Sequence, residues 1–443
     1  MTRTTAPFFL VLLLLSAPVH AGDNPELRRK IDALEQELKT ERERAAKERA
    51  AAEERLRALE AQVHELRSKD AVSAATAPPP AAPAALPRIP GILNPAIAVV
   101  GNFIFRGSDE KTFTEGGDRT DNRPNLREAE IDFRSAVDPY ADAVLIAALE
   151  SESPGHFDTS IEEGYITVKK LPFLDSPPQG LKLKLGRFRP EFGRLNKLHT
   201  HDLPQTMRPL VIEEFLGPEG FIEDGVSGQF FLPTPWDEES AIDVTLQALS
   251  GDIDVAPGGR NDAGFLGHAR WFRTFAETHN LELGWSSYFA RNDSPALHAL
   301  LHGADALYSW KPLRSGGSRS FLLGGEYLFA DRQFEGTTGS PALPLEERTS
   351  KPEGFYLFAQ VQSGPRWFFG VRGDWTETLD DSSVHRSGVT PYVSYYFSEF
   401  LRFRLNYEHL WGDRPQQYGR NNVFLEANWV IGSHPPEPFW VQK

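Results

Sequence analysis

Alternating apolar and polar residues fill the chain from about residue 95 onward. Residues 400–412 read FLRFRLNYEHLWG, and from Leu401 to Glu408 apolar and polar side chains strictly alternate. Successive side chains of a strand point to opposite faces, so this pattern predicts that Leu405 lies on an apolar face and that Arg402 and Arg404 lie on a polar one. An edge strand of a soluble β-protein is the alternative for any single segment.

About sixteen such segments follow one another, at the length of a tilted membrane-crossing strand. The connections between them alternate between long and short. The long ones lie near 107–124, 151–159, 193–220, 251–263, 291–299, 331–353, 377–387 and 412–421. Long loops at one end and short turns at the other are the layout of an outer-membrane barrel whose ends both lie on the periplasmic side. The expected fold is therefore an all-β transmembrane barrel of about sixteen antiparallel strands.

Four segments divide the chain. Residues 1–21 have a basic start, an apolar centre and a small-residue cleavage site, which predicts a secretory signal peptide. Residues 22–70 carry leucines at three- and four-residue spacing among charges, which predicts a periplasmic coiled coil; a single charged helix is the alternative. Residues 71–92 are rich in alanine and proline and predict an extended linker. Residues 93–443 form the predicted barrel.

The composition excludes several classes of function. The 443 residues include no cysteine and carry a formal net charge of −15. Disulfide frameworks, thiolate metal sites and cysteine nucleophiles are thus excluded, and the acidic balance argues against nucleic acid as a partner. No Gly-x-Ser-x-Gly, His-Glu-x-x-His or Gly-rich phosphate loop occurs. The chain is therefore not expected to be an enzyme, and no cofactor is expected.

Three short phrases carry a resemblance to a known family. They are LNPAI at 93–97, GRFRPEFGRLN at 186–196 and YYFSEFLRFRLNYEH at 395–409. Together with the coiled coil and linker, they resemble bacterial outer-membrane porins, nearest to the phosphate-selective (porin O/P-like) set and its "zinc-regulated" relatives. The resemblance implies a 16-stranded barrel in the outer membrane of a Gram-negative cell, often trimeric, through which small polar solutes or ions pass.

The connection 193–220 is the longest. The third external loop of 16-stranded porins folds into the barrel, so the resemblance implies that this is a constriction loop; an outward loop is the alternative. Its apolar residues favour inward packing. Its candidate functional residues are Arg194, His199, His201, Asp202 and Arg208. The run His199-x-His201-Asp202 offers imidazole and carboxylate ligands for a divalent metal such as Zn²⁺. Hydrogen bonds from these histidines to the barrel wall are the simpler alternative.

Charged residues at the polar positions of the strands are expected to line the lumen. The expected cations are Arg134, Lys182, Lys184, Arg187, Arg270, Arg372, Arg402 and Arg404. The expected anions are Glu128, Glu130, Asp132, Asp305, Glu326, Asp374, Glu408 and Glu426. Opposed charges would create a transverse field that filters small polar solutes, although pairs across neighbouring strands are the alternative. The nearly equal numbers of acids and bases predict a mixed-charge wall rather than an arginine ladder.

These features predict a porin for passive diffusion, with outer-membrane lipid as its surroundings and a homotrimer as its assembly. Two other functions fit the same pattern. One is an uptake channel for divalent metal, and the other is a structural tether in which the coiled coil contacts the cell wall and the barrel is only an anchor.

Overall fold

The computed structural model describes Gln36, Lys39 and most of residues 95–441. The gaps in that range are 110–121, 154–155, 172–173, 175–176, 235, 238–239, 252, 254, 257–262, 292–296, 313–318, 337–345, 414–419 and 434–437. The chain divides into two units, 1–87 and 88–443. Gln36 and Lys39 are helical. The predicted signal peptide, linker and remaining coiled coil lie outside the described residues.

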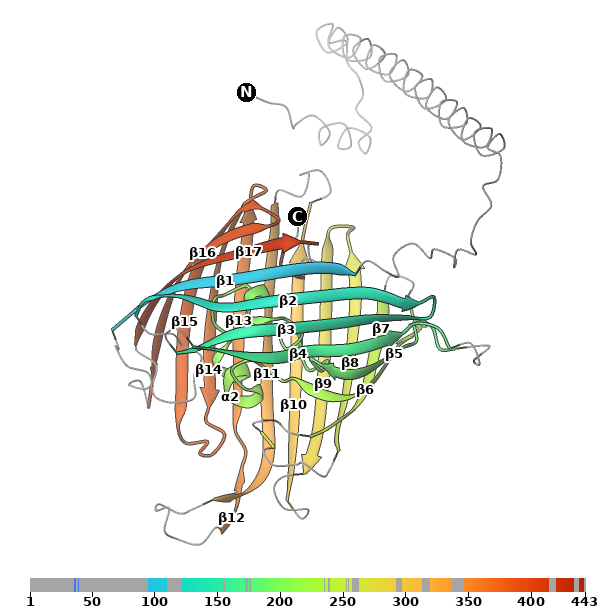
Figure 1. Ribbon diagram of the computed structural model, residues 1–443, viewed down its shortest axis with the longest axis horizontal. Helices are drawn as coiled ribbons and strands as arrows, with labels where there is room; N and C mark the ends of the chain where they lie inside the picture. Colours follow the sequence, from blue (N-terminus) through green and yellow to red (C-terminus); the bar gives the residue numbers. More distant parts are fainter. Residues whose placement is uncertain are drawn as a thin grey trace, which may run out of the picture. The chain divides into compact units, whose positions relative to one another are not determined.

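The second unit is a wall of antiparallel strands (Figure 1). Its first strands are β1 (Ala96–Ser108), β2 (Pro124–Asp138), β3 (Ala141–Ser153), β4 (His156–Val168), β5 (Lys182–Phe188), β6 (Glu223–Leu232), β7 (Ser240–Leu249), β8 (Gly264–Phe275) and β9 (His279–Arg291). The others are β10 (His298–Trp310), β11 (Arg319–Gly336), β12 (Glu346–Ser350), β13 (Glu353–Ser363), β14 (Trp367–Glu377), β15 (His385–Ser398), β16 (Leu401–Gly412) and β17 (Asn421–Gly432). A 3₁₀ turn, η1 (Thr200–Asp202), and a short helix, α2 (Leu210–Leu216), lie between β5 and β6.

The wall is closed. β1 pairs with β2 on one side and with β17 on the other, where Ala98 stands opposite Gly432 and Ser108 opposite Asn422. β12 and β13 both pair with β11 and are separated only by Lys351 and Pro352, so they form one interrupted strand. Proline lacks the N–H that a strand ladder needs, which accounts for the interruption. The barrel therefore has sixteen strands around its circumference, as the alternation predicted.

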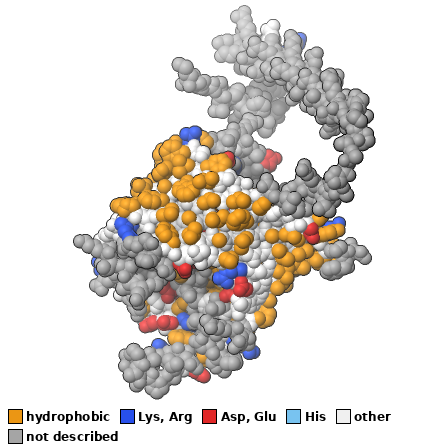
Figure 2. Space-filling view, in the orientation of Figure 1, with side chains coloured by type: hydrophobic (Ala, Val, Ile, Leu, Met, Phe, Trp, Pro, Cys, Tyr) orange, Lys and Arg blue, Asp and Glu red, His pale blue; other side chains and the backbone are white. Residues whose placement is uncertain are grey.

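The two faces of each strand differ in the predicted way. In β16, Arg402, Arg404 and Glu408 are buried, whereas Phe403 and Leu405 are exposed. The same alternation recurs around the wall and leaves many large apolar side chains on the outside. Figure 2 shows these side chains gathered over the outer face of the strands. Soluble monomers rarely expose apolar surface on this scale, so the outer face is suited to lipid.

Among the described residues, no helix is both long enough and apolar enough to cross a membrane.

Candidate functional site

The segment between β5 and β6, residues 189–222, lies inside the barrel. Its apolar side chains, including Leu195, Val211 and Phe215, are fully buried and form a core with wall residues such as Leu301 and Phe358. α2 lies against β13, β14 and β15 (Figure 1). Burial of apolar surface therefore holds this segment, the inner loop, against one side of the lumen.

Wall arginines fix the main chain of the inner loop. Each donates a hydrogen bond to a carbonyl oxygen that no regular strand or helix would satisfy. The contacts are Arg127 Nη1 to Thr206 O (2.8 Å), Arg372 Nη1 to Met207 O (2.6 Å), Arg402 Nη2 to His201 O (2.6 Å) and Arg404 Nη2 to Leu203 O (2.7 Å). Guanidinium groups with several donors suit this role, because one N–H can bind the loop while another pairs with a wall carboxylate.

Glu426 on β17 is the shared partner of two of these arginines. Its Oε1 lies 2.8 Å from Arg402 Nη2, and its Oε2 lies 3.0 Å from Arg404 Nη1. All three side chains are almost fully buried. The carboxylate therefore compensates cations that the loop has removed from water, which makes this group part of the loop's support rather than of an open wall.

A glycine permits the loop's close approach to β11. Gly193 has a φ of +58°, and a Cβ at this position would collide with the carboxylate of Glu326. The same carboxylate accepts a hydrogen bond from the backbone N–H of Leu195 at 2.9 Å. The N–H of Gly193 donates to Ser286 Oγ at 2.9 Å. Both the backbone conformation and the lack of a side chain are needed here.

The end of the chain also enters the barrel. Trp440 is fully buried, and its indole Nε1 donates a hydrogen bond to the carbonyl oxygen of Asp202 in the inner loop. The guanidinium carbons of Arg402 and Arg404 lie 5.4 and 5.5 Å from its ring centroid, within the range of cation–π contacts. Gln360 Nε2 donates to the carbonyl oxygen of Trp440 at 2.9 Å. Trp440 is therefore held against both the inner loop and the wall.

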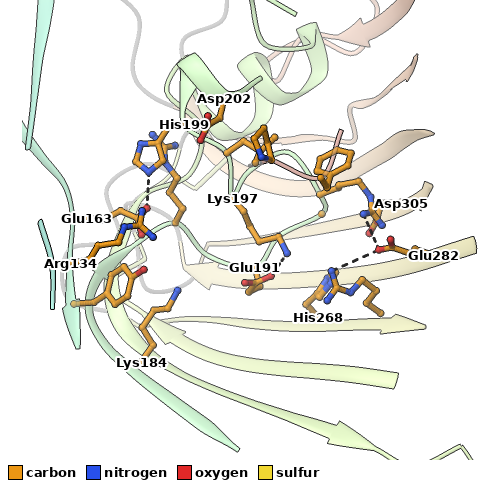
Figure 3. Close-up of a pocket in the computed structure, with 18 residues that line it drawn as sticks. Arg134, Glu163, Lys184, Glu191, Lys197, His199, Asp202, His268, Glu282 and Asp305 are labelled. Carbon is orange, nitrogen blue, oxygen red and sulfur yellow. Dashed lines mark hydrogen bonds and ion pairs between the residues drawn. The ribbon is translucent and has the colours of Figure 1, made fainter. Parts of the chain in front are cut away.

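A cavity of about 440 Å³ lies between the inner loop and the wall. Figure 3 shows lining side chains from the wall, such as Lys184 and His268, and from the loop, such as Lys197 and His199. The basic lining residues are Arg134, Lys184, Arg189, Arg194, Lys197 and Arg270, and the acidic ones are Glu163, Glu191, Asp202, Glu282 and Asp305. His199, His268, Pro438 and Phe439 also line it. The near balance of acids and bases makes this a polar, mixed-charge surface.

Most of these charges are paired across the cavity wall. Lys197 Nζ lies 2.9 Å from Glu191 Oε2, and Arg194 bridges Glu282 at 3.0 Å and Asp305 at 3.1 Å. Burial raises the pKa of Glu191, but Lys197 outweighs it and holds that pKa below its ordinary value. Burial lowers the pKa of Arg194, and its two carboxylate partners together raise it above the usual range.

Two lysines differ from the others. Lys182 and Lys184 on β5 line a second cavity of about 240 Å³, which shares Tyr165 and Glu191 with the larger one. Within the part of the chain that the structure describes, neither lysine has a carboxylate within 4 Å. The ammonium group of Lys184 lies 4.4 Å from the centroid of the Tyr165 ring. These lysines therefore offer cationic groups that a passing solute can reach.

The histidines of the inner loop face a group of wall glutamates. His199 Nε2 lies 2.8 Å from Glu163 Oε1, and His201 Nδ1 lies 3.0 Å from Glu130 Oε1. Burial lowers the pKa of both imidazoles, yet the carboxylate of Glu130 outweighs burial and raises each pKa well above its ordinary value. Arg208, also in the loop, has no carboxylate oxygen within 4 Å among the described residues. Burial lowers its pKa to about 10, and its Nη2 donates to Leu198 O at 3.0 Å.

The predicted lumen residues fall into three groups. Arg134, Lys182, Lys184 and Arg270 line cavities. The inner loop or neighbouring side chains cover the others, which are buried: Glu128, Glu130, Asp132, Asp305, Glu326, Arg372, Asp374, Arg402, Arg404, Glu408 and Glu426. Asp305 also contributes to the cavity lining. The placement of Arg187 in the lumen is wrong. It lies on the outer face of β5, opposite to Lys184, where its Nη1 is 3.5 Å from Asp224 and both side chains are exposed.

Several important residues were not predicted as lumen or loop residues. Arg189, the partner of Glu162, lies just before the expected loop, and Trp440 lies in a tail with no strand pattern. Period two places Arg189 on the same face as Arg187, so the alternation of β5 could not have found its inward position. No signal of period two marks Trp440.

Comparisons with known proteins agree with the architecture. No protein-family model matches the chain. An uncharacterized protein of Aquifex aeolicus (strain VF5) is 28% identical over 353 residues, which cover 71% of this chain and 70% of that protein.

Solved structures with a similar fold are outer-membrane porins. The Salmonella typhi OmpF structure, solved in complex with daunomycin, aligns at a TM-score of 0.50 and 10% identity and covers 76% of this chain and 97% of OmpF. The anion-selective porin of Comamonas acidovorans aligns at 0.47 and 10% identity and covers 77% and 99% of the two chains. The chain therefore has the sixteen-stranded antiparallel barrel fold of porins.

Proposed function

We propose that this protein is an outer-membrane channel through which small polar solutes or ions diffuse passively. The observation that carries the proposal is the charged cavity between the inner loop and the wall strands β2, β4, β5 and β8 to β10, inside a closed barrel with an apolar outer surface. Such a barrel has no unpaired strand edge, and its polar interior is separated from lipid by the wall. The inner loop acts as the constriction.

The cavity's charges suit solutes that carry both polar and charged groups. Paired acids and bases produce a transverse field, which orients dipolar solutes without strongly favouring one sign of charge. Lys182 and Lys184 add a local cationic region on β5. The proposed substrates are therefore small polar molecules and ions of either sign. The tail residues Pro438 and Phe439 also line the cavity and narrow it further.

Planar-bilayer recording of the purified, folded protein tests this proposal. We expect discrete conductance steps that grow with salt concentration and a reversal potential near zero in a salt gradient. Folded barrels that insert into the bilayer without conducting would contradict the channel and favour the tether. Strong anion selectivity would contradict the mixed-charge filter while leaving the channel intact.

The assembly is a separate part of the proposal. We propose a homotrimer in the outer membrane of a Gram-negative cell, with the coiled coil of residues 22–70 in the periplasm. The leucine spacing of that segment supports oligomerisation. Native mass spectrometry should give the mass of three chains, and deletion of residues 24–69 should shift the distribution toward single barrels. An unchanged trimer after the deletion would show that the barrel walls alone hold it together.

A further inference from the structure

Imidazoles and carboxylates gather where the inner loop meets β2 and β4. The two imidazole rings stack with their centroids 5.6 Å apart. All members of this group, the loop–wall cluster, are buried: His199, His201, Glu128, Glu130, Glu162 and Glu163. The group lies at the edge of the main cavity, which His199 and Glu163 also line (Figure 3).

One carboxylate oxygen stands between the two histidines. Glu130 Oε1 lies 3.2 Å from His199 Nδ1 and 3.0 Å from His201 Nδ1, and Glu162 Oε2 lies 2.8 Å from His199 Nδ1. Despite these short separations, neither Nδ1 atom makes a hydrogen bond of ordinary geometry to any residue that the structure describes. Ligand atoms around a tetrahedral metal with bonds of about 2.0–2.1 Å lie about 3.3 Å apart. Two sets of described residues have ligand atoms close enough to share a metal, and Glu130 belongs to both: Glu130, Glu162 and His199, and Glu128, Glu130 and His201.

Glu128 supplies a second, independent observation. It is 4% exposed, and neither of its carboxylate oxygens accepts a hydrogen bond from any described residue. Its Oε1 lies 3.9 Å from His201 Nδ1 and points into the cluster. A buried carboxylate without donors is strongly unfavourable unless it is protonated or a cation accompanies it. A cation held by Glu128, Glu130 and His201 would satisfy both unpaired oxygens.

The remaining nitrogen of His199 is already oriented for ligation. Its Nε2 lies 2.8 Å from Glu163 Oε1 and can donate its proton to that carboxylate. Metal-binding histidines usually make this contact with their second nitrogen, because it fixes the tautomer and turns the other lone pair toward the metal. In His199 that lone pair is on Nδ1, the atom nearest Glu130 and Glu162.

We propose that Glu130, together with His201 and Glu128 or with His199 and Glu162, binds a divalent transition metal of the zinc class. Imidazole nitrogens with carboxylate oxygens are the donor set that such metals prefer. The ligands come from the loop, β2 and β4, so the metal fastens the loop to the wall. Asp202 is not a ligand in this arrangement: its Oδ1 lies 3.6 Å from His201 Nε2, on the other edge of the ring.

Zinc titration of the full chain, folded in detergent and stripped with a chelator, tests the proposal. We expect about one Zn²⁺ per chain and a higher unfolding temperature when it is bound. Glu130→Gln, and the double variant His199→Gln with His201→Gln, should lose this binding. Glu163→Gln should weaken it roughly tenfold. Asp202→Asn and His268→Gln are the matched controls and should bind as the unchanged protein does.

Zinc-edge X-ray absorption on the unchanged protein should show imidazole and carboxylate ligands, a measurement that does not depend on whether the variants fold. Absence of binding by the folded, unchanged protein would overturn the proposal and leave two protonated imidazoles among carboxylates. Binding that survives Glu130→Gln, or that Asp202→Asn abolishes, would overturn this ligand set. None of these measurements uses conductance, so their outcome is separate from that of the proposed channel.

Discussion

The indole Nε1 of Trp440 donates a hydrogen bond of 2.6 Å to the carbonyl oxygen of Asp202. This contact joins the tail that follows the last strand to a loop more than two hundred residues earlier in the chain. Both segments lie inside the barrel, and Arg402 and Arg404 contact both of them. The loop's position therefore depends on the tail as well as on the wall.

Trp440→Ala should loosen the inner loop. The substitution removes the contact with Asp202, the two cation–π contacts and a large buried side chain, and we expect a loss of about 3 kcal/mol in the free energy of unfolding. Single-channel conductance should rise, because the neighbouring Phe439 lines the cavity. Urea unfolding and bilayer recording measure the two effects. Trp411→Ala, at an outward-facing position that is 47% exposed, is the control and should change neither conductance nor selectivity.

Glu426→Gln should be among the most destabilising single changes in the barrel. It leaves Arg402 and Arg404 buried without their shared counter-charge, which typically costs about 3 to 5 kcal/mol. The exposed pair of Lys169 and Asp142, 2.8 Å apart, provides the comparison, and Asp142→Asn should cost less than about 1 kcal/mol. Chemical unfolding of both variants gives the difference. Equal losses would show that Glu426 does not support the loop.

Lys184→Glu should shift ion preference toward cations. The substitution reverses an unpaired charge that lines both cavities, and we expect a change on the order of twofold in the ratio of cation to anion permeability. Arg187→Glu is the matched control on the same strand. Because Arg187 lies on the outer face, its reversal should leave the reversal potential unchanged. A shift of similar size in both variants would mean that net charge, rather than position, sets the selectivity.

The pair of Lys197 and Glu191 should make stability depend on pH. The pKa of Glu191 is lowered in the folded protein, so its contribution is present above the ordinary glutamate pKa and is lost as the pH falls through the lowered value. The pair is partly exposed, so this contribution is roughly 0.5 kcal/mol. Lys197→Met should be less stable than the unchanged protein at pH 7, and the difference should shrink as the pH falls through the lowered pKa of Glu191. A difference that does not change with pH would show that packing, not charge, accounts for the effect.

The sequence predicted the barrel and the long loop, but not how the loop fills the lumen. Period two is a strong signal, because one face of each strand must be apolar; Leu405 and Arg404 illustrate it. An inward arginine, however, can face water or bind a distant carbonyl, and the pattern is the same in both cases. Arg404 binds a distant carbonyl, that of Leu203 in the inner loop. Arg187 was misplaced because it was grouped with nearby lysines by charge, although its position parity matches that of Leu183 and Leu185.

Contacts between residues distant in sequence could not be predicted from local patterns either. The glutamates of β2 and β4 face the loop histidines only because β2 and β4 are both close to residues 199–201 once the barrel closes. The tail carried even less sequence signal, because the residues from Pro435 to Pro438 show neither strand nor helix periodicity. The role of Trp440 depends on Arg402 and Arg404, which lie on another strand.

The interior is supported unevenly around its circumference. Strands β2, β4, β9 to β11 and β13 to β16 all contact the inner loop, whereas β5 and β8 contribute Lys184 and Arg270 to the lining of the open space. Substitutions that tune permeation can therefore accumulate on those two strands without disturbing the contacts that hold the loop. Protein engineering or natural selection could thus change the solute that passes by substituting residues of β5 and β8. The arginines of β14 and β16 would stay unchanged.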